Sequence, residues 1–188
     1  MSTHTISSAS LELSTIEKIL VEKQKLSLTD DAKKKIVAGR KYLDKKLKQT
    51  KEPIYGINTG FGALYNKSVA EKDLEKLQRN LVMSHACGAG DEVPQPIVKL
   101  MLLLKVQGLS YGNSGVQLET VQRLIDFYNN DVLPVVYQQG SLGASGDLAP
   151  LAHLSLPLIG EGEVYYQGKK QPAKSVLKKF GWQPIHLQ

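Results

Sequence analysis

The sequence predicts a mainly α-helical protein with one small β-hairpin. Apolar residues recur at helical spacing through several long stretches, as they do on the buried face of a helix. Acidic residues or prolines precede several of these stretches and glycines follow some of them, which is the pattern of helix starts and ends. No internal repeat or low-complexity linker divides residues 1–188, so a single domain is expected.

The first long helix is expected to begin after Thr29. Asp30 and Asp31 then suit the positive end of the helix dipole, and the helix should end before Pro53. One apolar face of this basic helix carries Ala32, Ile36, Leu43 and Leu47. Residues 54–66 contain three glycines and two tyrosines without helical or strand periodicity, which predicts an ordered loop or lid.

The next helix is predicted to open at a capping box formed by Ser68 and Glu71. Its buried stripe is expected at Leu74, Leu77 and Leu81. His85 lies one turn beyond this stripe and should continue the inward face, and Gly88 and Gly90 should end the helix.

Two helices are expected in the middle of the chain. Pro94 and Pro96 precede a helix over residues 97–110 that is apolar nearly all round, so it should be central. Ser114 and Gln117 form a second capping-box pattern before the other helix. The apolar face there is Val116, Val121, Leu124, Ile125 and Tyr128.

Shorter elements complete the chain. An apolar helix is expected over residues 148–156, with Pro150 tolerated in its first turn. Residues 163–171 alternate around Gln167-Gly168, which predicts the hairpin, and a small basic helix follows.

Composition limits the classes of protein that fit. The 188 residues are 41% hydrophobic and 22% charged, as in a soluble globular protein with a substantial core. Cys87 is the single cysteine, so no internal disulfide can form and a reducing compartment is expected. The first sixteen residues carry no secretory signal, and the longest apolar run, residues 100–104, is too short to span a bilayer. We therefore expect a cytoplasmic protein without a membrane partner.

The net charge of +6 does not indicate nucleic-acid binding. Residues 17–52 hold twelve basic and six acidic side chains, so the whole surplus lies there, on what the pattern predicts to be a solvated helix face. Tyr42 is the only aromatic residue in this region, whereas nucleic-acid sites interleave basic and stacking side chains.

The tripeptide Ala144-Ser145-Gly146 is the strongest chemical signal. Side chains are poor electron sinks, so an enzyme that needs one borrows a cofactor or builds it. If the Gly146 nitrogen attacks the Ala144 carbonyl carbon and two waters leave, one of them from Ser145, a methylidene-imidazolone ring forms. The alternative is a glycine-rich loop that cradles a phosphate, but no Lys-Ser, Lys-Thr or GxGxxG accompanies it.

Three sequence motifs resemble those of the aromatic amino acid ammonia-lyase family, and of histidine ammonia-lyases above all. They are IYGINTGFG at 54–62, NLVMSHACGAG at 80–90 and GSLGASGDLAPLAHLSLPLIGEG at 140–162, in the family's order and at family-like spacing. Because family members are much longer, the resemblance implies that residues 1–188 are the N-terminal catalytic-loop domain of such a lyase, without its C-terminal helical-bundle region. It also implies the mainly α fold of the fumarase/aspartase-like superfamily and a homotetramer.

The resemblance implies a mechanism as well. The protein-derived methylidene-imidazolone, with no external cofactor or metal, captures the amino acid, and Tyr55 removes a β-proton before ammonia leaves. His85 selects the substrate, because histidine and tyrosine lyases carry His here whereas phenylalanine lyases carry Phe followed by Leu. The predicted reaction converts L-histidine to urocanate and ammonia. A tyrosine ammonia-lyase or an aminomutase remains an alternative, as does an inactive fragment that acts only as a folding or interaction unit.

Other residues are assigned supporting roles. Asn58 and Gly62 are expected to shape the loop that carries Tyr55. Asp147 has two interpretations, a carboxylate that caps the following helix or a participant in ring formation. His153 is interpreted as a packing or capping residue rather than a catalyst.

Overall fold

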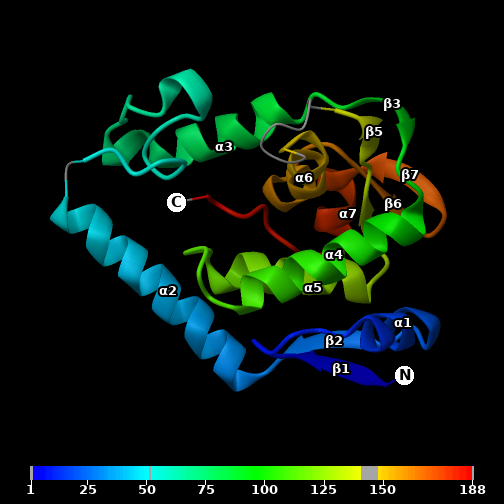
Figure 1. Cartoon of the computed structure of the whole chain (residues 1–188). Coiled ribbons are helices and arrows are strands. Elements are labelled where there is room, and N and C mark those ends of the chain that lie inside the picture. The colour runs from blue at the N-terminus through cyan, green and yellow to red at the C-terminus, as the bar shows by residue number, and fades with distance from the viewer. Residues whose placement is uncertain (1, 51, 141–147, 188) are drawn as a thin grey trace. The chain divides into compact units, whose positions relative to one another are not determined.

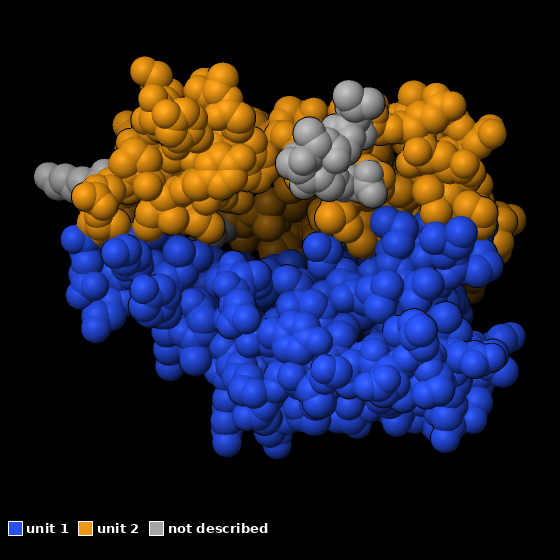
Figure 2. All heavy atoms as spheres, in the orientation of Figure 1, with its two compact units in different colours: residues 1–49, 95–133 blue, residues 50–94, 134–188 orange. Residues whose placement is uncertain are grey.

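The computed structural model describes residues 2–50, 52–140 and 148–187, and it confirms a mainly α-helical fold with short strands. The chain forms two compact units, residues 1–49 with 95–133 and residues 50–94 with 134–188 (Figure 2). The single domain expected from the sequence stays a prediction. In chain order the elements are β1 (Thr3–Ile6), α1 (Leu13–Val21), β2 (Lys25–Leu28), α2 (Asp30–Gln49), the 3-10 turns η1 (Gly62–Leu64) and η2 (Glu71–Asp73), α3 (Leu74–His85), β3 (Ala89–Glu92), α4 (Gln95–Ser110), α5 (Leu118–Asn129), β4 (Leu133–Pro134), β5 (Tyr137–Gln139), α6 (Leu148–Ser155), the 3-10 turn η3 (Leu156–Ile159), β6 (Glu163–Tyr166), β7 (Lys169–Pro172) and α7 (Ala173–Phe180).

The first unit is built on α4 and α5, which pack side by side (Figure 1). α2 contacts both helices, and β1 pairs in parallel with β2. As predicted, α2 begins after Thr29, whose Oγ1 accepts the Ala32 N–H at 3.2 Å. Buried apolar side chains fill the core, among them Ile6, Ile19, Ile36, Leu102, Val106, Leu124 and Phe127.

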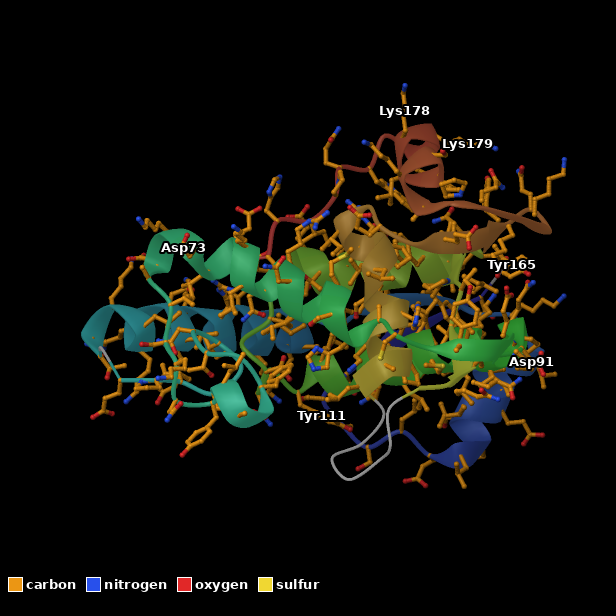
Figure 3. The ribbon with its side chains drawn as sticks, turned by 90° about the horizontal axis from the view of Figure 1, so that it is seen from above. Asp73, Asp91, Tyr111, Tyr165, Lys178 and Lys179 are labelled. Atoms are coloured by element: carbon orange, nitrogen blue, oxygen red, sulfur yellow. The ribbon has the colours of Figure 1, made fainter. Side chains whose placement is uncertain are left out.

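The second unit combines α3, α6 and α7 with short strands. α3 packs against α6, β3 pairs antiparallel with β5, and β6 and β7 form the predicted hairpin. The turn of that hairpin places Gln167 and Gly168 at φ +53° and +71°, the left-handed values of a tight hairpin turn. α7 covers the hairpin, and its Lys178 projects away from the ribbon (Figure 3). The core includes Val136, Ala149, Leu154, Val164, Val176, Leu177 and Ile185.

Both predicted capping boxes are wrong. Ser68 pairs with Thr59 in an isolated β-bridge and Ala70 is extended, so the helix cannot start there; α3 begins at Leu74 without a capping bond from any described side chain. Gly115 lies at φ +68°, which breaks the helical path between Ser114 and α5. Gln117 therefore becomes the N-cap of α5, and within the described ranges no side chain caps it.

Candidate functional site

The two site residues that the sequence singles out most strongly, Tyr55 and His85, both lie beside the ring of Phe61 in the second unit. The Phe61 ring is 5.6 Å from that of Tyr55 and 5.2 Å from that of His85, measured between centroids. We call Tyr55, Phe61 and His85 the aromatic cluster. Tyr55 is 61% exposed, so much of this side chain is accessible to solvent. Phe61 was not predicted from the sequence. Its ring packs close to the loop backbone, since a Cβ added to Gly56 would lie only 2.8 Å from it.

Side chains within the loop hold the Tyr55 segment in shape. Asn58 Oδ1 accepts the Ile54 N–H at 2.7 Å, and the buried Thr59 accepts the Gly56 N–H at 3.2 Å. Gly62 adopts φ +57°, a conformation that favours glycine. These contacts make residues 54–62 an ordered loop rather than an extended linker.

Gln78 of α3 supports the same loop and was not anticipated from the sequence. Its Nε2 donates to the carbonyl oxygens of Gly56 and Ile57 at 2.9 and 2.8 Å. The helical repeat offered a signal, because Gln78 lies four residues after Leu74 and seven before His85, on one face of the helix. The face predicted to be buried is only half-buried, so a polar side chain fits on it.

His85 closes α3 with a defined tautomer. Its Nδ1 lies 2.7 Å from the carbonyl oxygen of Leu81, and a carbonyl only accepts, so Nδ1 carries the hydrogen. In the neutral ring Nε2 is then an acceptor. Among the residues that the structure describes, none donates a hydrogen bond to Nε2. The half-buried ring thus offers one acceptor beside the aromatic cluster.

His153 of α6 is a buried packing residue with a hydrogen-bonded ring. Its Nε2 accepts the Gly88 N–H at 2.9 Å, and the Tyr137 ring meets it edge on, with centroids 5.1 Å apart. Burial lowers the pKa of His153 below its usual 6.5, which favours the neutral acceptor.

The proposed ring-forming residues Ala144, Ser145 and Gly146, with Asp147, lie outside the described residues. The flanks on either side are described. A Cβ built on Gly140 would lie 2.8 Å from the Ala149 Cβ in the first turn of α6, so the two flanks meet in van der Waals contact.

The described ranges hold neither a cluster of metal ligands nor a membrane-spanning helix. No group of three or more His, Cys, Asp and Glu side chains there could hold a metal ion. No helix in the same ranges combines the length and apolar character needed to cross a membrane.

The sequence matches the protein family described as "Aromatic amino acid lyase" over residues 11–188. A histidine ammonia-lyase from Myxococcus xanthus (strain DK1622) is 46% identical over 178 residues, which cover 95% of this chain and 35% of the relative. The chain therefore spans about a third of the length of the curated relatives it matches.

Solved structures share the fold. The histidine ammonia-lyase from Trypanosoma cruzi superposes with a TM-score of 0.86 at 35% identity and covers 100% of this chain with 36% of its own length. The phenylalanine aminomutase of Pantoea agglomerans gives a TM-score of 0.90 at 28% identity over 100% of this chain and 36% of its own.

Proposed function

The chain belongs to the aromatic amino acid lyase family, and on this premise we propose that it is the N-terminal part of an ammonia-lyase that converts L-histidine to urocanate and ammonia. The observation that carries the choice of substrate is the acceptor at Nε2 of His85 beside the aromatic cluster. An imidazole N–H can donate to this atom. A plain phenyl ring cannot, and it would leave the acceptor unpaired at a cost of about 1–3 kcal/mol.

In this proposal Tyr55 acts as the general base. Its exposed Oη takes a proton from the substrate β-carbon, the electrons of that C–H bond form the new double bond, and the amino group leaves with the electrons of its C–N bond. The bonds from Asn58, Thr59 and Gln78 to the loop keep Tyr55 in place for this transfer.

We assign the electrophile to a methylidene-imidazolone made from Ala144, Ser145 and Gly146. This group supplies an electron sink that the twenty side chains lack. α6 begins two residues after the tripeptide, and the N-terminal end of a helix dipole favours negative charge on that side. Asp147 acts there either as a cap or in ring formation.

The remaining features of the proposal concern the whole protein. We place it in the cytoplasm as a homotetramer that acts on a free amino acid. A tyrosine ammonia-lyase or an aminomutase is the second candidate, because a phenol O–H also donates to Nε2 and an aminomutase shares the fold at 28% identity.

The test is an assay of two proteins, the 188-residue chain and a polypeptide that continues it to the length of its curated relatives. Both are weighed intact, since ring formation removes the mass of two waters, and then incubated with L-histidine, L-tyrosine and L-phenylalanine. We expect dehydration, and release of ammonia and urocanate from L-histidine by the longer protein. Preference for tyrosine, or an amino group retained as a β-amino acid, selects the second candidate. If the longer protein shows neither dehydration nor turnover, the proposal is refuted. The remaining interpretation is then an inactive folding or interaction unit.

A further inference from the structure

A half-buried hydrogen bond joins the turn that follows α3 to α6. The Gly88 N–H donates to Nε2 of His153 at 2.9 Å, across sixty-five residues of sequence. His153 is only 8% exposed, and Tyr137 packs edge on against its ring. The acceptor therefore belongs to a buried imidazole that its neighbours hold in place.

The same contact leaves no room for a side chain on the turn. A Cβ at Gly88 would lie 2.9 Å from Nε2 of His153 and 3.1 Å from the Tyr137 Cβ. The backbone at Gly88 thus packs directly against the His153 ring and the Cβ of Tyr137.

This junction connects two parts of the proposed site. Gly88 comes three residues after His85, the last residue of α3, and α3 packs against α6. α6 in turn follows the proposed ring-forming tripeptide, and its Ala149 touches Gly140 on the other flank. The bond between Gly88 and His153 therefore adds to the packing of α3 on α6 near the end of α3, where His85 lies.

We propose that His153 is a positioning residue of the lyase, which holds the turn after His85 onto the helix that follows Ala144-Ser145-Gly146. The inference rests on the proposed function. His153 acts through Gly88 and makes no contact with Tyr55 or His85 that the structure describes. Burial, which keeps the ring neutral, preserves its acceptor.

The experiment compares three variants of the protein extended to the length of its relatives. His153→Phe keeps a flat buried ring without the acceptor, His153→Gln offers an amide acceptor, and His186→Gln changes an exposed histidine bound to Glu75 in the same unit. We expect His153→Phe to lower kcat/KM for L-histidine by about tenfold to a hundredfold, the cost of a displacement of about 1 Å. His153→Gln should recover most of this loss, and His186→Gln should match the wild type.

Two readouts separate positioning from a general loss of folding. A displaced His85 lowers the ratio of kcat/KM for L-histidine to that for L-phenylalanine, whereas a smaller folded fraction scales both equally. Hydrogen exchange of the peptide around Gly88 should also quicken in His153→Phe and recover in His153→Gln. An unchanged ratio in His153→Phe overturns the inference. If the wild type releases no ammonia, the proposed function fails, and exchange alone decides whether His153 holds the turn: unchanged exchange overturns that too.

Discussion

The rings of Phe61 and His85 meet edge to face, with centroids 5.2 Å apart and planes inclined by 76°. Such a pair contributes about 0.5–1.5 kcal/mol beyond the area it buries. The Leu81 carbonyl fixes the same imidazole from the other side through Nδ1. Two contacts therefore fix the orientation of the His85 ring, one with an aromatic neighbour and one with its own helix. Together they fix the direction in which Nε2 accepts a hydrogen bond.

In the protein extended to the length of its relatives, replacement of His85 by Phe should shift substrate preference from L-histidine towards L-phenylalanine. Without the acceptor an imidazole N–H loses its partner, so kcat/KM for L-histidine should fall roughly tenfold to a hundredfold, the equivalent of about 1–3 kcal/mol. Activity on L-phenylalanine should rise relative to L-histidine. Steady-state assays with both amino acids measure the ratio, and a variant that still prefers L-histidine as strongly as the wild type contradicts the role of His85.

In the same extended protein, loss of the Tyr55 hydroxyl should lower turnover strongly and leave binding intact. A positioned general base contributes about a hundredfold to ten-thousandfold, so Tyr55→Phe should lower kcat by that factor. Tyr65→Phe is the matched control, since Tyr65 is a comparably exposed tyrosine of the same region, 60% against 61%. Turnover and isothermal titration with L-histidine check the two halves of the expectation. Equal rates for the two variants would remove Tyr55 from the mechanism.

The loop that carries Tyr55 should depend on Gln78. Gln78→Leu removes both hydrogen bonds to the carbonyls of Gly56 and Ile57, and the loss should amount to about 1–3 kcal/mol of loop stability. Hydrogen exchange across residues 54–62 should therefore quicken. Gln122→Leu, on an exposed face of α5 where the amide meets only Asp126, should leave that exchange unchanged. Equal exchange in the two variants would mean that the loop keeps its conformation without the hydrogen bonds from Gln78 of α3.

Much of the fold was predictable because local signals decide it. The face of α2, the hairpin turn at Gln167-Gly168 and the buried stripe of α5 follow from residues close together in sequence. The capping boxes failed because the pattern says nothing of Gly115, whose positive φ ends the helical path, or of the bridge between Thr59 and Ser68. Those features depend on backbone geometry and on pairing with another segment.

The missed elements share a different cause. β1 and β2 are four-residue parallel strands joined through α1, and β3 pairs with β5 across more than forty residues, so neither pair leaves a local turn signal. At the site, Tyr55 and His85 were predictable because they lie in sequence motifs that resemble the family's. Phe61, Gln78 and the bond between Gly88 and His153 emerge only when loop, α3 and α6 come together.

Glycine at position 88 should be required for stability. Gly88→Ala places a methyl group 2.9 Å from the His153 ring, and such overpacking typically costs about 1–3 kcal/mol. Gly108→Ala is the control, because position 108 lies inside α4 with open space around a Cβ, and alanine there should stabilise by about 0.5–1 kcal/mol. Urea unfolding of the two variants should thus shift in opposite directions. A Gly88→Ala variant as stable as the wild type shows that the His153 ring moves freely.

Stability should decline on the acid side of neutrality through His153. Burial lowers the pKa of His153 in the folded chain, whereas in the unfolded chain it stays near 6.5. Above that pH both states are neutral and the bond from Gly88 contributes fully. As the pH falls below it, the unfolded chain takes up a proton first and stability drops, until the folded ring is protonated as well and can no longer accept.

The pKa of His4 is also lowered by burial, so the wild type alone does not isolate the effect. Urea unfolding between about pH 8 and 5 should therefore compare the wild type with His153→Gln, which does not titrate and keeps an acceptor, and with His4→Gln. The His153→Gln profile should be flatter than the wild type over this range while that of His4→Gln retains the His153 slope, and parallel profiles for His153→Gln and the wild type would mean that His153 does not titrate with folding.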